Sequence, residues 1–468
     1  MTFQRDLAWE SLDLAYRSGV AHQLARYALR LDYKMLPENV VHQAKRCLLD
    51  ALGCAIGAYD APGRLICEAV AAELGGPEEA TVFGSGLRTS AYNATLVNCF
   101  LVRFLDYNDV GGGGHNSDAI PSILAISERE KASGKDFLTS LVISYELGYR
   151  FKDSAVGFSF KEKGWCPDTR GGLSMPPALG KLMKLTEEQI ANAIGICASH
   201  SLPLGVLDAD REENTMMKNL RFGIVSHNAI LACLLARKGF TGPVRVVEGD
   251  QGLRQAIFQG NMDLERLVDF SGWHILDTRH KTICANAGSH GHISATLEIV
   301  KEQNLKPEDI VAVKIRAGRG ESRHTTVRAK KYPRNAETAD HSACYANAIA
   351  IIDRTFGPQS FSPAKFTDPL VLNLIEKITV EYDASVPAWG GISEITTREG
   401  LRFEKRVDTA HGFGDDPLTD GELEDKFQAM ALSYMHEEQI QNIFKKVWHI
   451  EDLDDMSSLA KLMVTGLR

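Results

Sequence analysis

Residues 104–121 read FLDYNDVGGGGHNSDAIP and join two mainly apolar segments, 94–105 and 120–126, that are typical of buried helices. The stretch gathers six polar side chains around four consecutive glycines: Asp106, Asn108, Asp109, His115, Ser117 and Asp118. Glycines 111–114 can adopt positive φ and let a ligand or another part of the chain come close. A surface turn would have the same composition. A polar loop between two buried elements favours a position at the mouth of a cavity.

The chain has 468 residues, of which 44% are hydrophobic and 24% charged, an ordinary globular composition that allows two or three domains. Its net charge is −9, and no run of Lys or Arg resembles a patch for nucleic acid or a membrane surface. We therefore expect neither as a partner, although an acidic protein can still bind a small anion at a locally basic site. No segment has the uninterrupted apolar length that spans a bilayer.

The nine cysteines are scattered, with no C-x-x-C pair and no Cys/His zinc spacing. An odd number of unclustered cysteines in apolar surroundings predicts reduced thiols in a cytoplasmic protein. The same scatter argues against an iron–sulfur cluster, so we expect no metal. The first residues, MTFQRDLAWESLDLAYRSG, are neither a signal peptide nor a basic transit peptide.

Helical spacing of apolar residues dominates the chain up to about residue 270. The expected helices cover residues 8–31, 37–59, 63–75, 90–105, 119–133, 134–151, 171–205 and 214–238. No clear strand pattern interrupts them. The sequence therefore predicts a large helical domain here.

Alternating patterns then indicate strands at 309–317, 378–382, 392–397 and 401–407, with a hairpin turn at 398–400. Helices are expected between them, at 290–302, 337–354 and 368–377. The chain returns to helix at 421–435, 437–446 and 456–467, after a capping box formed by Thr419 and Glu422. These last helices have no partner of their own. We predict a mainly α fold with a helical domain from residues 1–270 and 408–468, and an inserted α+β lid domain at 271–407.

Five segments, in order, resemble the MmgE/PrpD family, which includes 2-methylcitrate dehydratase and cis-aconitate decarboxylase. They are residues 36–59, the loop at 104–121, 217–223 (MKNLRFG), 338–346 (TADHSACYA) and 417–427 (PLTDGELEDKF). The resemblance implies a helical domain built from both chain ends, a smaller α+β lid, a site in the cleft and a homodimer. It also implies a metal-independent, cofactor-free enzyme whose substrates are small tricarboxylates and their relatives.

Dehydration of a β-hydroxy carboxylate requires removal of a C–H proton and protonation of the hydroxyl leaving group. His115 is the natural acid or base, with Asp106 or Asp109 to orient it. Lys218 would hold a substrate carboxylate. Tyr345 lies four residues after His341 on the expected helix 337–354, so the two would share a face. The alternatives are a loop-bracing His115, a solvated Lys218 and a Tyr345 in the core of the lid.

The resemblance thus predicts four catalytic residues: Asp106, His115, Lys218 and Tyr345. It predicts five substrate-binding residues: Asp109, Cys166, Lys281, His290 and His341. Either His290 or His292 fits the family's lid histidine within residues 281–293, and we prefer His290.

Three departures from the family pattern bear on the substrate. Val110 replaces a Thr and Asn116 replaces a Pro, while Cys166 or Asp168 stands near the position of a further decarboxylase histidine. A thiol is a poorer proton shuttle at neutral pH. These changes disfavour cis-aconitate and 2-methylcitrate and favour a different hydroxy acid or a cyclic analogue, in a pocket that the glycines 111–114 would enlarge.

We therefore expect a lyase, specifically a dehydratase of a small hydroxy-polycarboxylate. A decarboxylase or epimerase of a related carboxylate is the alternative within the same class. A non-catalytic carboxylate-binding protein is the alternative outside it.

Overall fold

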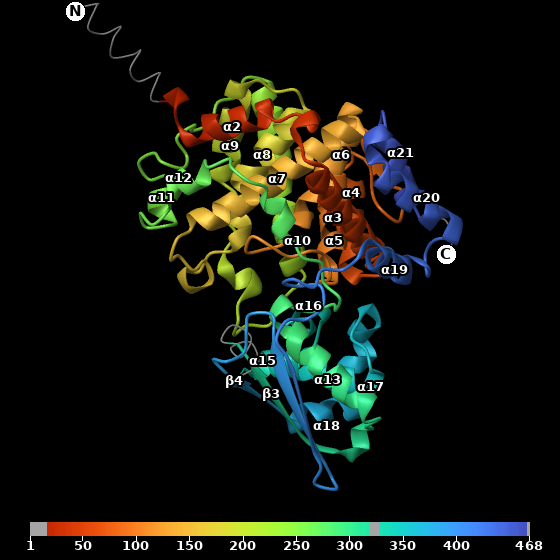
Figure 1. Ribbon diagram of the computed structural model, residues 1–468. Helices are drawn as coiled ribbons and strands as arrows, with labels where there is room; N and C mark the ends of the chain where they lie inside the picture. The colour runs from red at the N-terminus through yellow and green to blue at the C-terminus, as the bar shows by residue number, and fades with distance from the viewer. Residues whose placement is uncertain (1–15, 319–326, 466–468) are drawn as a thin grey trace, which may run out of the picture.

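The computed structural model describes residues 16–318 and 327–465. It is mainly helical, as predicted, and Figure 1 shows a helical body above a smaller part that contains the principal sheet. Residues 8–15 of the expected first helix, and the end of the expected last one, lie outside the described residues.

Nine long helices of the described residues form most of the body. They are α2 (Val20–Arg30), α3 (Glu38–Gly57), α4 (Pro62–Leu74), α5 (Ala91–Phe104), α6 (Ile120–Glu130), α7 (Gly134–Ser154), α8 (Gly171–Leu182), α9 (Glu187–Ala198) and α10 (Met217–Arg237). The expected helix at 171–205 is divided into α8 and α9, because Thr186 and Gln189 form a capping box that starts a new helix.

A pair of two-residue antiparallel strands, β1 (Ala80–Thr81) and β2 (Arg88–Thr89), lies beside these helices. The expectation of no strand before residue 270 was therefore wrong for this short pair. The turn between two helices supplies too few residues for a periodic pattern to be visible.

Helix α10 crosses the interior of the body in contact with α5, α8 and α9. It is the one helix in the described ranges that is long and apolar enough to cross a membrane, which the sequence analysis had not expected. A core helix passes the same test, and 61% of the apolar window is buried inside the protein.

The principal sheet has the strand order β4-β3-β5-β6, with β3 (Ile310–Ala317), β4 (Ile378–Tyr382), β5 (Gly391–Thr397) and β6 (Arg402–Val407). Strands β3 and β4 are parallel, with Val313 opposite Ile378, and the other pairs are antiparallel. Gly400 has φ +81° in the predicted β5–β6 turn. Helix α13 (His290–Glu302) packs on β5 and β6, and α18 (Pro369–Lys377) packs on β3 and β4.

The expected helix 337–354 is broken into α16 (Ala336–Ala339) and α17 (Ala343–Asp353). Ser342 caps α17 by accepting a hydrogen bond from the backbone N–H of Tyr345 at 3.1 Å. His341 therefore precedes α17, and the prediction that His341 and Tyr345 share one helical face was wrong.

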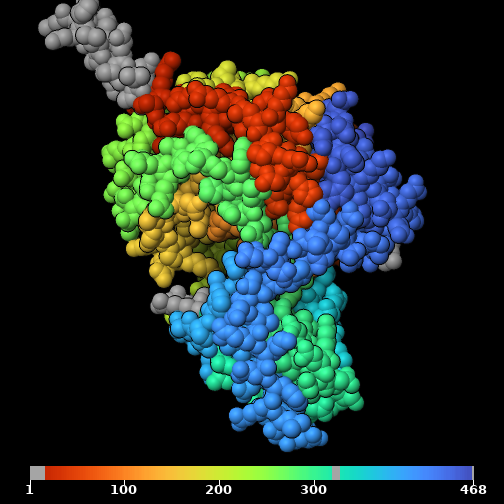
Figure 2. All heavy atoms as spheres, viewed as in Figure 1, coloured from red at the N-terminus to blue at the C-terminus, as the bar shows by residue number. Residues whose placement is uncertain are grey.

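The C-terminal helices α19 (Asp420–Ala431) and α20 (Glu437–Trp448) pack on α3, and α21 (Ser457–Ala460) packs on α6. The Thr419–Glu422 capping box starts α19 as predicted. Figure 2 shows the segment between β6 and α19 covering the junction of the two parts on the viewed face. The domain boundaries at 270 and 408 and the role of the insertion as a lid stay predictions.

Candidate active site

Asp106 is the centre of a buried cluster of charges at the junction of the two parts. It follows α5 directly with φ +46°, a left-handed conformation that Asp tolerates better than most residues. Arg103 Nη1 lies 2.7 Å from Asp106 Oδ1, and Lys281 Nζ lies 2.6 Å from the same atom. Burial alone would raise the pKa of Asp106, but Arg103, Lys281 and Lys218 hold that pKa well below its usual value. Asp106 is therefore a charged carboxylate.

His115 presents one ring nitrogen to this carboxylate. Its Nδ1 lies 2.7 Å from the backbone carbonyl oxygen of Asp109, which only accepts hydrogen bonds, so Nδ1 carries the proton. Its Nε2 lies 3.4 Å from Asp106 Oδ1. Burial lowers the pKa of His115 well below 6.5, and the Arg103 and Lys281 charges lower it further. At neutral pH the ring is uncharged, and Nε2 is free to take a proton.

The carboxylate of Asp109 faces the other way. It accepts hydrogen bonds from the Ser117 hydroxyl at 2.7 Å and the Tyr145 hydroxyl at 2.5 Å. Burial raises the pKa of Asp109 to about 6. Of the two aspartates considered for orienting His115, Asp106 contributes its carboxylate and Asp109 its backbone carbonyl.

The glycines 111–114 form a tight turn in which the Gly111 N–H donates to the Gly114 carbonyl at 2.9 Å. Gly112 and Gly113 have φ +57° and +78°, as expected for glycines in such a turn. A Cβ added to Gly111 would lie 1.8 Å from the Tyr149 hydroxyl. The expectation that the glycines enlarge the pocket was wrong, because Tyr149 occupies the space beside Gly111.

Lys218 lies in the first turn of α10 and is 0% exposed. Its ammonium donates to the carboxylate of Asp340 and lies 3.6 Å from Asp106 Oδ2. The alternative of a solvated Lys218 was therefore wrong. The ion pair between Lys218 and Asp340 connects α10 of the body to the segment between α16 and α17.

His341 lies on the same side of the cluster as Lys218. Its Nδ1 is 2.6 Å from Asp340 Oδ1, and its Nε2 is 3.5 Å from Asp208 Oδ1. Burial and the Lys218 charge lower the pKa of His341. Burial alone would raise the pKa of Asp208, but His341 and Arg221 hold it well below its usual value. His341 is thus a second buried imidazole, flanked by two carboxylates.

Lys281 uses all three of its N–H donors inside the protein. They go to Asp106 Oδ1 at 2.6 Å, to the Asp106 carbonyl at 2.8 Å and to the Ala285 carbonyl at 2.9 Å. A lysine has no fourth donor. The structure thus brings Lys281 to the cluster, as predicted, but with its hydrogen-bonding capacity already filled.

Three other predicted residues make no hydrogen bond to Asp106 within the described ranges, although His290 is close enough to interact electrostatically with Lys281 and Asp106. Burial raises the pKa of the Cys166 thiol to about 12, which leaves it protonated at neutral pH. The His290 ring packs edge-on against Phe413 at 4.9 Å, and burial lowers its pKa to about 3. The Tyr345 hydroxyl donates to the Ser360 carbonyl within the sheet-containing part.

Five charged residues of the cluster were missed by sequence reasoning: Arg103, Asp208, Arg221, Lys330 and Asp340. Three of them carried a visible signal. Arg103 is the one cation in the apolar run 94–105, Asp340 directly precedes His341, and Arg221 lies in the family-like segment 217–223. Asp208 and Lys330 lie in segments whose pattern resembles ordinary surface sequence.

Asp106, Asp340 and His341 bring potential ligand atoms within 4.8 Å of one another, so a metal ion is a possibility to be tested. The two carboxylates already face the ammonium groups of Lys281 and Lys218. A divalent cation would have to displace these lysines or share the carboxylates with them, at a large Coulombic cost. The donor set therefore fits a metal poorly.

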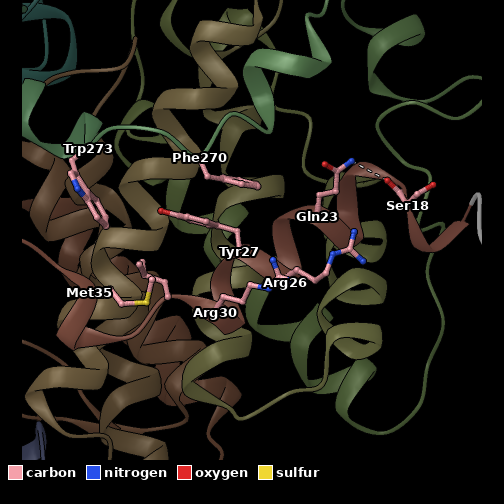
Figure 3. Close-up of a pocket in the computed structure, with 9 residues that line it drawn as sticks. Ser18, Gln23, Arg26, Tyr27, Arg30, Met35, Phe270 and Trp273 are labelled. Atoms are coloured by element: carbon pink, nitrogen blue, oxygen red, sulfur yellow. Dashed lines mark hydrogen bonds between the residues drawn. The ribbon is translucent and has the colours of Figure 1, made fainter.

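Two hollows differ in their relation to this cluster. One, of about 680 Å³, lies on α2, where Tyr27 stacks on Phe270 at 4.3 Å beside Arg26 and Arg30, as Figure 3 shows. Its lining includes no His, Asp, Glu or Lys. A second, of about 930 Å³, lies at the junction, and its lining includes Leu105 next to Asp106 in the chain. The junction hollow is thus the one that approaches the charged cluster.

Buried imidazoles and a charged carboxylate at the junction of a mainly helical body and a small α+β part are typical of a site for acid–base chemistry. The MmgE/PrpD N-terminal domain model matches residues 22–265, and the MmgE/PrpD C-terminal domain model matches residues 284–450. The chain belongs to the MmgE/PrpD family.

The relatives whose names state an activity are named for different reactions. A cis-aconitate decarboxylase-like protein of Aspergillus oryzae is 24% identical over 96% of this chain and 98% of its own length. The cis-aconitate decarboxylase of Homo sapiens is 24% identical over 92% of this chain and 91% of its own length. The 2-methylcitrate dehydratase of Escherichia coli is 22% identical over 81% of this chain and 82% of its own length. These similarities support an enzyme of this family and leave its reaction open.

Proposed function

We propose that this protein is a metal-independent lyase that removes water from a small hydroxy-polycarboxylate. The observation that carries the proposal is the pair of buried imidazoles, His115 and His341, on either side of the Asp106 carboxylate. Elimination of water needs one group to accept a C–H proton and another to protonate the leaving hydroxyl. Two imidazoles that face one carboxylate supply both.

His115 suits the role of base. Its Nε2 carries a free lone pair, and the proton it accepts is stabilised by Asp106 at 3.4 Å. His341 is the candidate acid. The Asp340 and Asp208 carboxylates beside its two nitrogens favour the protonated ring and partly offset burial and the Lys218 charge, which lower its pKa. After elimination, His115 holds the proton taken from carbon, and His341 has given its proton to the hydroxyl that leaves as water. Release of the His115 proton to solvent and uptake of a proton by His341 restore the starting protonation state.

Lys218 and Lys281 differ in what they offer a substrate. Lys218 has one close hydrogen bond, to Asp340, and so retains donors for a substrate carboxylate. Lys281 has none to spare and instead holds Asp106 in place. We propose that Lys218 binds substrate and that Lys281 is a positioning residue.

Decarboxylation is the second candidate reaction, and the decarboxylases among the relatives, which match more than nine-tenths of this chain, favour it. Loss of CO₂ needs a proton donor for the resulting carbanion but no acid for a leaving hydroxyl. Epimerisation needs proton transfer alone. Both reactions could use His115 or His341 for proton transfer, and neither reaction requires an acid that protonates a leaving hydroxyl.

A panel of hydroxy acids and unsaturated acids separates these reactions. Citrate, 2-methylcitrate, tartrate and malate would be assayed for enoate absorbance, and cis-aconitate for CO₂ release. We expect enoate formation from at least one hydroxy acid without release of CO₂. Release of CO₂ from cis-aconitate would instead establish the decarboxylase, and turnover of no substrate with tight carboxylate binding would indicate a binding protein.

We also propose a cytoplasmic homodimer. The nine cysteines are buried free thiols, as is typical of a reducing compartment. Four large apolar side chains are exposed on α4, namely Leu65, Ile66, Val70 and Leu74, and such a patch is typical of an interface. Light scattering on the purified protein would show twice the mass of one 51.5 kDa chain.

A further inference from the structure

The buried lysines at the junction differ in how many of their three donors are used. Lys426 donates to Asp50 at 2.6 Å and to the carbonyls of Tyr107 and Lys281 at 2.8 and 2.9 Å. Like Lys281, it is fully satisfied. Lys426 and Lys281 therefore have structural roles.

Lys330 is the exception. It lies in α15 (Arg328–Lys331), beside α16 and α17, and is 0% exposed. Within the described part of the chain its Nζ has no hydrogen-bond partner. It is close enough to Asp208, Asp340 and Lys218 to interact with them electrostatically. Its buried ammonium therefore lies near these charges, with three donors that no described residue accepts.

An unsatisfied buried ammonium is costly, so its retention calls for a reason. Burial lowers the pKa of Lys330 to about 8, which leaves it mostly protonated at neutral pH. A carboxylate bound there would recover the lost solvation through charge-assisted hydrogen bonds.

The nearby aspartates already face other cations. The ion pairs are Asp106–Arg103, Asp106–Lys281, Asp340–Lys218, Asp208–Arg221, Asp168–Arg221 and Asp168–Arg170. In these pairs four aspartates face five cations, and Lys330 adds a further positive charge. The position is therefore complementary to an anionic group from outside the chain.

We infer that Lys330 binds a second carboxylate of the substrate, on the Asp208–His341 side of the cluster. This inference rests on the proposed function and deepens it: Lys218 receives one carboxylate and Lys330 another. The enzyme therefore selects acids with at least two carboxylates over monocarboxylates of the same length. A monocarboxylate would leave the Lys330 ammonium unpaired, and that unpaired group is the basis of the selection.

The test compares succinate with butyrate, which have four carbons and differ in one carboxylate, with citrate as a third probe. Binding is measured by calorimetry on wild-type protein, Lys330→Met and Lys330→Gln. Wild-type protein should bind succinate and citrate more tightly than butyrate. The Lys330 variants should lose about 10- to 100-fold in affinity for succinate and citrate, with butyrate binding unchanged.

Lys331→Met is the matched control, because Lys331 is the next residue of α15 and forms a surface ion pair with Glu376 at 3.5 Å. It should bind all three probes as wild type does. Lys330→Met should also keep or raise the melting temperature without ligand, since it removes an unpaired buried charge. Two substitutions of Lys330 are used so that, if one variant folds poorly, the other still tests the inference.

Three results would overturn the inference. A Lys330 variant that keeps the wild-type preference for succinate over butyrate overturns it while the proposed function stands. A lowered melting temperature with unchanged probe binding assigns Lys330 a structural role. Wild-type protein that binds neither citrate nor succinate overturns the proposed function and this inference together.

Discussion

The Nε2 atom of His115 lies 3.4 Å from Oδ1 of Asp106, within the loop between α5 and α6. The imidazole is fixed from behind by its Nδ1 hydrogen bond to the Asp109 carbonyl. Asp106 is fixed by Arg103 and Lys281. The relationship is that of a base and the carboxylate that stabilises its protonated form, both held rigidly before substrate arrives.

His115→Ala should lower kcat by about 10²- to 10⁴-fold with little change in KM, because general base catalysis acts in the transition state. The measurement is kcat, KM and melting temperature on the substrate identified from the panel. His411→Ala is the control, since His411 is a 43% exposed side chain paired with Asp416 and Glu422. A lowered melting temperature with near-wild-type kcat would show that His115 only braces the loop.

Lys218→Met and Lys281→Met should affect different constants. Loss of Lys218 should raise KM, since its free donors bind a substrate carboxylate, whereas loss of Lys281 should lower kcat by releasing Asp106. Loss of Lys218 should lower the free energy of unfolding by about 3–5 kcal/mol, because it removes the lysine paired with the buried Asp340. Loss of Lys281 should lower it less, because Arg103 still pairs with Asp106. Steady-state kinetics and denaturant unfolding provide the comparison. An equal increase in KM in both variants would contradict the assignment of substrate binding to Lys218 and of a positioning role to Lys281.

The acid limb of kcat/KM should lie below pH 6.5. Burial lowers the pKa of His115 below its ordinary value, so the neutral, proton-accepting form is already dominant at pH 7. As pH falls through the lowered pKa, the base becomes protonated and the rate declines. A pH–rate profile checks this, and a rate that is still rising above pH 7 in proportion to His deprotonation would rule out a neutral His115 as the base.

Activity should be unchanged by EDTA. Lys281 and Lys218 already neutralise the carboxylates of Asp106 and Asp340, which are two of the three potential metal ligands. Protein dialysed against chelator should match untreated protein in kcat, with metal content followed by elemental analysis. Loss of activity that Fe²⁺ or Mg²⁺ restores would refute the metal-independent mechanism.

Gly111→Ala should destabilise the protein by about 1–3 kcal/mol, because the added methyl overlaps the Tyr149 hydroxyl. It should also lower kcat by displacing the turn that ends at His115. Gly421→Ala is the control, since a Cβ there meets no atom within 4 Å and α19 is a helix that favours Ala. Thermal unfolding of both variants provides the measurement, and equal melting temperatures would contradict the close contact with Tyr149.

Much of this organisation was visible in the sequence. Helical periodicity, the strands after residue 309, the hairpin at Gly400 and the Thr419–Glu422 cap are local patterns, and each reports on neighbours within a few residues. The polar loop around His115 was recognisable for the same reason, because its composition contrasts with the apolar helices on either side. The break between α16 and α17 was missed, since a Ser cap inside a helical pattern is a weak signal.

The pairing of charges was decided by the tertiary structure alone. Lys218 and Asp340 are 122 residues apart, and Lys281 and Asp106 are 175 apart, so no local pattern connects them. Whether a lysine binds substrate or is already satisfied depends on how many acceptors surround its three donors, and those acceptors come from distant segments. For that reason the sequence pointed to Lys281 as a substrate-binding lysine and did not single out Lys330. In the structure all three donors of Lys281 are used within the protein, whereas the buried Lys330 ammonium has no described hydrogen-bond partner.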